Sequence, residues 1–189
     1  MYLFFDTETT GVPDDRNAPL TDSDNWPRMV QIAWIFEDKT GNRIEQDEFI
    51  IKPENFDIPQ ESSEIHGITN KKAKLEGKDL NTVLVKFSEL LNKADTLVGH
   101  NISFDVKIIG AELLRNNFHP NFREKEKICT QKSSTNYCKL PGKYGYKWPT
   151  LPELHTKLFG DDFKEAHDAS VDIKATEKCF WELKNIGVL

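Results

Sequence analysis

Cysteine is scarce in this sequence, and long apolar runs are missing. Its three cysteines are Cys129, Cys138 and Cys179, and no two of them form a Cys-x-x-Cys pair. This spacing argues against a disulfide framework and against a zinc site. No apolar run reaches the roughly 20 residues of a membrane helix, and no basic leader precedes the first apolar stretch, so neither a membrane partner nor a signal peptide is predicted. We expect a reduced, cytoplasmic protein.

Linkers, repeats and low-complexity tracts are also missing. No segment rich in proline, glycine and serine divides the 189 residues, a length that suits one domain with a full core. Hydrophobic residues make up 38 % of the chain, with 12 Phe and 4 Trp to fill an interior. We therefore predict a single domain over residues 1–189.

Positive charge is confined to one region. The net charge of −6 alone argues against a nucleic-acid binder. However, residues 121–148 hold seven basic and two acidic side chains, a net of +5, which leaves −11 on the rest of the chain. Tyr137, Tyr144, Tyr146 and Trp148 are interleaved with these lysines. Cations beside stacking surfaces suit a single nucleic-acid strand, but a solvated loop with some aromatics packed into the core explains the composition equally well.

Hydrophobic periodicity predicts an α/β fold. Three β-rich stretches come first and predict an antiparallel start, at residues 2–5, 29–36 and 43–51, with a long polar loop at 11–27 between the first two. Helical patterns then alternate with short strands. Helices are expected at 62–66, 70–75, 80–91, 103–116, 151–159 and 169–184, and strands at 96–98 and 128–130. This order predicts a mixed central sheet of about five strands flanked by helices.

Two carboxylates follow the first predicted strand, which we expect to end at Asp6. Asp6 and Glu8 are two residues apart in FFDTETTG, and positions i and i+2 of a strand face the same side. At about 4 Å and an effective dielectric near 20, two such charges repel by about 4 kcal/mol, and a divalent cation would reverse that sign. A pair of acids in a polar turn is the alternative, although the apolar residues before them favour a metal site.

Three further candidates occur in two later motifs. Asp105 in HNISFD lies in the first turn of a predicted helix with Ser103 as N-cap, where the helix dipole favours an acid without further function. His167 and Asp172 in HDASVD are five residues apart, about 140° around a helix. We therefore expect His167 in the preceding loop, Asp168 as N-cap and Asp172 on the helix, close to the sheet. A solvated loop position is the commoner role of a lone histidine.

Together, DTETTG, HNISFD and HDASVD resemble the three motifs of the DEDD superfamily of exonucleases. The His-x4-Asp spacing of the third is similar to that of its DEDDh branch, which includes the proofreading (epsilon) subunit of bacterial DNA polymerase III. The resemblance covers nearly the whole domain and implies a ribonuclease H-like fold and a 3′–5′ exonuclease. It implies two Mg²⁺ or Mn²⁺ ions, one held by Asp6, Glu8 and Asp172 and the other by Asp6 with support from Asp105. His167 would be the general base on the attacking water.

The same resemblance implies contacts to the 3′-terminal nucleotide. These would come from Thr9 after the first motif, from Ile65 and His66 in IHGIT, and from Phe104 in the second motif, although Phe104 also fits simple core packing. Two features depart from the family pattern. The stretch 14–26 is longer and more acidic than expected, and Gln31 stands where many relatives carry a glutamate.

The leading prediction is hydrolysis of single-stranded or frayed DNA from its 3′ end, with release of nucleoside 5′-monophosphates. DNA is the favoured substrate, and the same chemistry on RNA, as in RNase T or oligoribonuclease, is an alternative. A non-catalytic module that binds nucleic-acid ends or assists a polymerase is another. A DNA polymerase is the candidate protein partner, and the sequence gives no oligomeric state.

Overall fold

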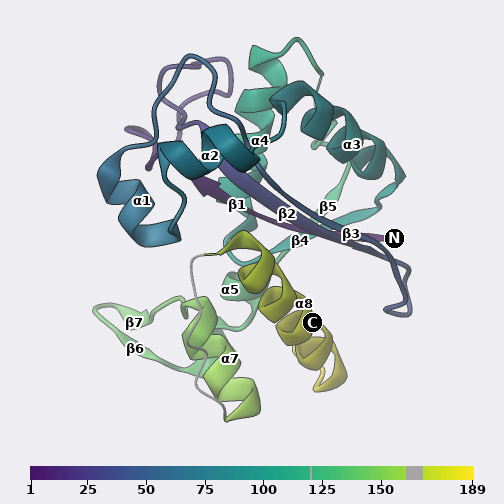
Figure 1. Ribbon diagram of the computed structural model, residues 1–189. Helices are drawn as coiled ribbons and strands as arrows, with labels where there is room; N and C mark the ends of the chain where they lie inside the picture. The colour runs from purple at the N-terminus through teal and green to yellow at the C-terminus, as the bar shows by residue number, and fades with distance from the viewer. Residues whose placement is uncertain (120, 161–167) are drawn as a thin grey trace.

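A central sheet with helices on both faces organises the chain (Figure 1). A computed structural model describes residues 1–119, 121–160 and 168–189. The sheet has the strand order β3-β2-β1-β4-β5. Its strands are β1 (Tyr2–Thr9), β2 (Met29–Glu37), β3 (Arg43–Ile50), β4 (Thr96–Gly99) and β5 (Glu126–Cys129). β1 and β2 pair antiparallel, as do β2 and β3, whereas β4 is parallel to both β1 and β5. The predicted α/β fold, with a mixed five-stranded sheet and an antiparallel start, is confirmed.

The structure describes eight helices, of which six were predicted and the two short ones that follow β5 were not. They are α1 (Gln60–His66), α2 (Asn70–Glu76), α3 (Leu80–Lys93), α4 (Ile102–Arg115), α5 (Thr130–Ser133), α6 (Thr135–Cys138), α7 (Leu151–Phe159) and α8 (Ala169–Asn185). A small hairpin of β6 (Pro141–Gly142) and β7 (Gly145–Tyr146) precedes α7. Within the described residues, no helix is both long and apolar enough to span a bilayer.

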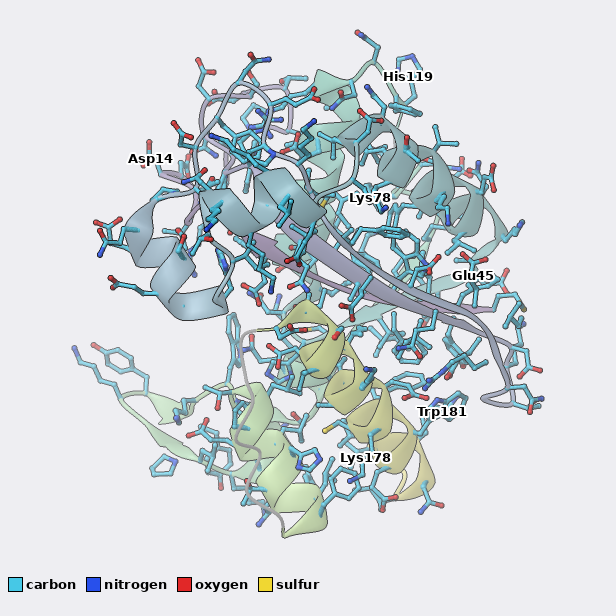
Figure 2. All side chains as sticks on the ribbon, viewed as in Figure 1. Asp14, Glu45, Lys78, His119, Lys178 and Trp181 are labelled. Atoms are coloured by element: carbon cyan, nitrogen blue, oxygen red, sulfur yellow. The ribbon has the colours of Figure 1, made fainter. Side chains whose placement is uncertain are left out.

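The central strand β1 is covered on both sides. Leu3 and Phe5 belong to the core cluster that includes α3 and α4. Phe4 belongs to a second cluster with Phe180 of α8, against which Trp181 packs (Figure 2). Because side chains alternate along a strand, even positions of β1 face α8 and odd positions face α3 and α4. Burial on both faces explains why this strand begins as a continuous apolar run.

β1 is longer than its apolar run. The expectation that the strand ends at Asp6 is wrong, because its pairing with β2 continues to Thr9. Asp6 lies opposite Ala33 and Glu8 opposite Gln31, and the register shifts only between Glu8 and Thr9. Backbone hydrogen bonds carry the strand beyond the point where hydrophobic side chains stop. The two acids therefore project from a strand and not from a polar turn.

A tight connection joins β4 to α4. Ser103, the expected N-cap, lies inside the helix, and the N-cap is Asn101 with φ of 72°. Asparagine is one of the few residues that adopt this left-handed conformation readily, so the chain turns from strand to helix within two residues. Asp105 consequently lies in the first turn of α4, beside the carboxyl end of the parallel strands.

Candidate active site

Three carboxylates from two elements converge near the carboxyl end of β1. Asp6 and Glu8 project from β1 on the side that faces α8, and Asp172 lies in the first turn of α8. One oxygen from each of the three lies within 4.8 Å of the others. Figure 1 shows that the start of α8 lies against the strands near one end of the sheet, which brings its carboxylate to those of β1.

Asp105 reaches the same end of β1 from the other face of the sheet. Its Oδ1 accepts hydrogen bonds from the backbone nitrogen of Thr7 at 3.1 Å and from the Thr7 hydroxyl at 2.8 Å. Asp105 is buried and is not a member of the group of three. Its charge nevertheless raises the pKa of Asp6, so it lies close to the group. The structure thus brings Asp6, Glu8 and Asp172 together and holds Asp105 beside them.

Burial and mutual repulsion shift the acids toward their protonated forms. Burial is the largest cause of the raised pKa of Asp6, followed by the charges of Asp105 and Asp172. The pKa of Glu8 rises to about 8, again by burial first and then by Asp172. Burial raises the pKa of Asp105 to about 7 against the opposing hydrogen bonds from Thr7. At neutral pH such a cluster must retain protons or take up a cation, and a set of carboxylate oxygens matches a hard divalent ion.

Two polar side chains fix the start of α8. Asp168 is the N-cap, as predicted, and its Oδ1 accepts from the backbone nitrogens of Ser170 at 2.9 Å and Val171 at 3.3 Å. Gln31 on β2 accepts from the backbone nitrogen of Ala169 at 3.2 Å through its side-chain oxygen. Gln31 therefore ties α8 to the sheet opposite Glu8 without adding another negative charge there.

Sequence reasoning missed the roles of Thr7 and Gln31. The sequence did contain a pattern that indicates the role of Thr7. Thr7 stands between Asp6 and Glu8, so its side chain must face the opposite side of the strand, where Asp105 lies. For Gln31 no local signal existed, because its partner Ala169 is 138 positions away. His167, the expected general base, lies outside the described residues. The residue that follows it, Asp168, is near enough for its charge to raise the pKa values of Asp6 and Glu8.

The four residues expected to contact a terminal nucleotide lie on three elements, β1, α1 and α4. Thr9 ends the strand, and its hydroxyl donates to the Gly11 carbonyl at 2.6 Å. His66 is buried at the end of α1, with a lowered pKa caused mainly by burial and opposed by the Thr9 backbone. Ile65 is 61 % exposed on the same helix. Phe104 packs partly on the core and also lines a cavity, so it fits both interpretations.

The basic aromatic segment presents most of its rings to solvent. Tyr144, Tyr146 and Trp148 are 91, 52 and 56 % exposed, respectively, whereas Tyr137 packs against the cluster formed by α7 and α8. Lys143 lies 5.1 Å from the Tyr144 ring centre, and Lys132 lies 5.2 Å from that of Trp148. Core packing therefore accounts for one of the four aromatics, and three remain as surface rings, two of them next to a lysine.

The sequence matches a family model and two known polymerases. The RNase_T family model, described as an exonuclease, matches residues 3–180. The PolC-type DNA polymerase III of Streptococcus pyogenes is 37 % identical over 117 residues, which are 61 % of this chain and 7 % of the polymerase. That of Pediococcus pentosaceus is 27 % identical over 187 residues, which are 97 % of this chain and 11 % of the polymerase. The chain thus spans only about a tenth of these relatives.

Solved structures show the same fold. The crystal structure of E. coli exonuclease I in complex with a dT13 oligonucleotide superposes with a TM-score of 0.75 at 23 % identity, covering 97 % of this chain and 40 % of that one. The zinc ion bound form of the E. coli exonuclease I–ssDNA complex gives a TM-score of 0.78 at 23 % identity, covering 98 % and 41 %. This likeness confirms the predicted ribonuclease H-like fold.

Proposed function

The chain belongs to the RNase_T exonuclease family, within the DEDD superfamily of 3′–5′ exonucleases, and from this premise we propose its substrate and mechanism. It removes nucleoside 5′-monophosphates from the 3′ end of single-stranded or frayed DNA. The observation that carries the proposal is the group formed by Asp6, Glu8 and Asp172, with oxygens within 4.8 Å of one another. A stable fold has no evident use for three clustered acids unless a cation neutralises them.

The donor set fits divalent metal ions. We propose that Asp6, Glu8 and Asp172 hold one Mg²⁺ or Mn²⁺, and that Asp6 and Asp105 hold a second. Mg²⁺ prefers oxygen ligands and retains waters, and the half-buried group leaves one side toward solvent. When bound, the ions would make a water more acidic and stabilise the negative charge on the leaving 3′ oxygen.

The protein's own residues orient this chemistry. Thr7 fixes the carboxylate of Asp105 with two hydrogen bonds, and Gln31 holds the end of α8 that carries Asp172. We propose His167 as the general base that takes the proton of the attacking water, because its spacing from Asp172 places it just before α8. It must be neutral to accept that proton, and an ordinary histidine has a pKa of about 6.5. Activity should therefore rise with pH through this range.

Other predicted site residues would bind the 3′ end of the nucleic acid. Thr9, Ile65, His66 and Phe104 are proposed to contact the terminal nucleotide. Thr9 and His66 are neighbours, and Ile65, which precedes His66, presents an exposed apolar side chain. The exposed rings and lysines of residues 121–148 would bind the strand on the 5′ side of its terminal nucleotide.

DNA is proposed as the substrate on two grounds. The structural relatives include exonuclease I bound to dT13, and the curated relatives are DNA polymerases. The matching part of those relatives is a small share of a polymerase chain, so a DNA polymerase is also the proposed partner. Accommodation of a ribose 2′-hydroxyl is the property on which RNA specificity would depend.

End-labelled oligonucleotides test the proposal. Single-stranded DNA and RNA, labelled at either end, are incubated with Mg²⁺, Mn²⁺ or EDTA. We expect metal-dependent release of the 3′ label, faster from DNA, and its loss in Glu8→Gln. The matched control is Glu48→Gln, which removes an exposed carboxylate from β3. If no substrate is shortened from its 3′ end in metal, the proposed activity is wrong, and preferential shortening of RNA would reassign the substrate.

A further inference from the structure

A cavity of about 470 Å³ lies between the loop at residues 11–27, the start of α4 and Trp148. Resting on the function proposed above, we propose that this cavity binds the nucleotide next to the 3′-terminal one. Its base would stack on Trp148, and its phosphate would face the cations Arg16 and Lys132. The cavity would thereby favour a flexible single strand over a paired end.

The charge of the cavity differs from that of the protein. Arg16, Lys107 and Lys132 all contribute to its lining, and among the described residues around it there is no carboxylate. This is unusual in a chain with a net charge of −6. Cations of this kind neutralise backbone phosphates. The cavity thus has the positive charge that a phosphate requires.

Aromatic side chains supply the stacking surface. Trp26, Phe104 and Trp148 line the cavity. Trp26 is buried and Phe104 is half-buried, whereas Trp148 is 56 % exposed, which leaves a large part of its ring available. The volume falls within the range of about 300–1,000 Å³ that is typical of small-molecule sites. It therefore suits one nucleotide and not a wide groove for a duplex.

The position of the cavity relative to the acids sets which nucleotide it takes. Phe104 lines the cavity and is followed directly by Asp105, and consecutive Cα atoms are about 3.8 Å apart. Asn101 and Ser103, in the same turn of chain, also line it. A nucleotide held here would lie immediately next to the one whose ester is cut, which makes it the penultimate nucleotide.

The outer wall of the cavity is fixed against α4. The ammonium group of Lys107 donates to the Arg16 carbonyl, and the guanidinium of Arg115 donates to the Trp26 carbonyl. Leu20 packs on Gly110 so closely that a Cβ there would come within 2.9 Å of Leu20 Cδ1. The 11–27 loop is thus docked along the helix, and the wall it forms exists before any ligand binds.

The Trp148 wall is fixed by a half-buried histidine. His100 Nε2 lies 3.0 Å from the Pro149 carbonyl, and its Nδ1 lies 3.0 Å from the Thr130 hydroxyl. Since a carbonyl can only accept, Nε2 carries the proton and Nδ1 accepts from Thr130. Burial lowers the pKa of His100 to about 4, which keeps the ring neutral near pH 7. This link holds the backbone beside Trp148, while Lys132 lies over the Trp148 ring at 5.2 Å.

The test compares substrates with and without a penultimate nucleotide. The p-nitrophenyl ester of thymidine 5′-monophosphate offers a cleavable bond and one nucleotide, whereas dT3 also offers its neighbours. Trp148→Ala should raise KM for dT3 by about tenfold, within the 5- to 150-fold range of a stacked base. It should leave kcat for dT3, and kcat/KM for the ester, within about twofold. Trp148→Phe should restore most of the affinity.

A matched control separates the cavity from the surrounding surface. Leu75→Ala removes an exposed apolar side chain of α2 that is outside the cavity lining, and KM for dT3 should not change. An unchanged KM in Trp148→Ala, an equal loss with the ester, or an equal loss in Leu75→Ala would overturn the assignment.

Binding without turnover keeps this test separate from the proposed activity. In EDTA, the fluorescence anisotropy of 5′-labelled dT12 should report a Kd about tenfold higher in Trp148→Ala than in the unmodified protein or Leu75→Ala. If the unmodified protein cleaves neither substrate, the exonuclease proposal fails, but this titration still decides the cavity. Equal Kd values in all three proteins would overturn the cavity assignment.

Discussion

The substitution Glu8→Gln should stabilise the metal-free protein at alkaline pH while abolishing its response to metal. Glutamine resembles the protonated form of the side chain, so the substitution removes the charge that burial and Asp172 disfavour. The pKa of Glu8 rises from 4.5 to about 8 in the folded chain. At about 1.4 kcal/mol per pH unit, full ionisation opposes folding by about 5 kcal/mol, and partial exposure to water reduces this to about 2–3 kcal/mol.

The sign and the pH window follow from the direction of the shift. Between pH 4.5 and about 8 the folded protein keeps a proton on Glu8 that the unfolded chain has lost. The free energy of unfolding therefore falls as pH rises through this interval and levels off above it. The difference between Glu8→Gln and the unmodified protein should be small near pH 4.5 and largest above pH 8. For a chain of this length, about 2–3 kcal/mol corresponds to a Tm rise of about 4–12 °C.

Thermal unfolding in EDTA from pH 5 to pH 9 measures this effect. Glu48→Gln is the control, because it removes an exposed carboxylate on β3 and should follow the unmodified protein. Millimolar Mg²⁺ at pH 8 should raise the Tm of the unmodified protein and of Glu48→Gln but not that of Glu8→Gln. Parallel Tm curves for Glu8→Gln and the unmodified protein at all pH values would refute the reasoning.

Further predictions concern the residues around the carboxylates. His167→Ala should lower kcat by about 10²–10⁴-fold and abolish the rise of activity through about pH 6.5, and an unchanged pH–rate profile would reject the general base. Thr7→Val removes a 2.8 Å hydrogen bond to Asp105 and should lower metal-dependent activity by about tenfold, whereas Thr7→Ser should retain it; equal kinetics of both variants would exclude this orienting role. Arg115→Ala should increase hydrogen exchange in residues 11–27 and raise KM for dT3, because it removes the hydrogen bond from Arg115 of α4 to the Trp26 carbonyl in this loop. Unchanged exchange would contradict the docking of the loop on α4.

Elements with a regular hydrophobic period could be predicted from the sequence. The apolar, β-rich runs give the first strands of the antiparallel start, and the helical periods give the order of α3, α4, α7 and α8. The end of β1 could not be found in this way, since its last four residues, DTET, pair through their backbone and carry no apolar signal. The cap at Asn101 was missed for a related reason, because a left-handed turn depends on where β4 ends.

The candidate site was predictable as a set of residues but not as a geometry. The motif spacing indicates Asp6, Glu8, Asp105 and Asp172, and the alternation in β1 predicts that the first two share a side. That Asp105 approaches from the opposite face, held by Thr7, depends on packing that no local pattern encodes. The docking of the 11–27 loop depends equally on long-range contacts, as between Leu20 and Gly110.

Anomalous diffraction from crystals soaked in Mn²⁺ would test the proposed metal centre most directly. We predict an anomalous peak in contact with carboxylate oxygens of Asp6, Glu8 and Asp172, and a second peak between Asp6 and Asp105. Both should disappear in Asp6→Asn and persist in Glu48→Gln. Crystals that bind Mn²⁺ elsewhere and show no peak among these carboxylates would contradict a metal-dependent nuclease site at the end of β1.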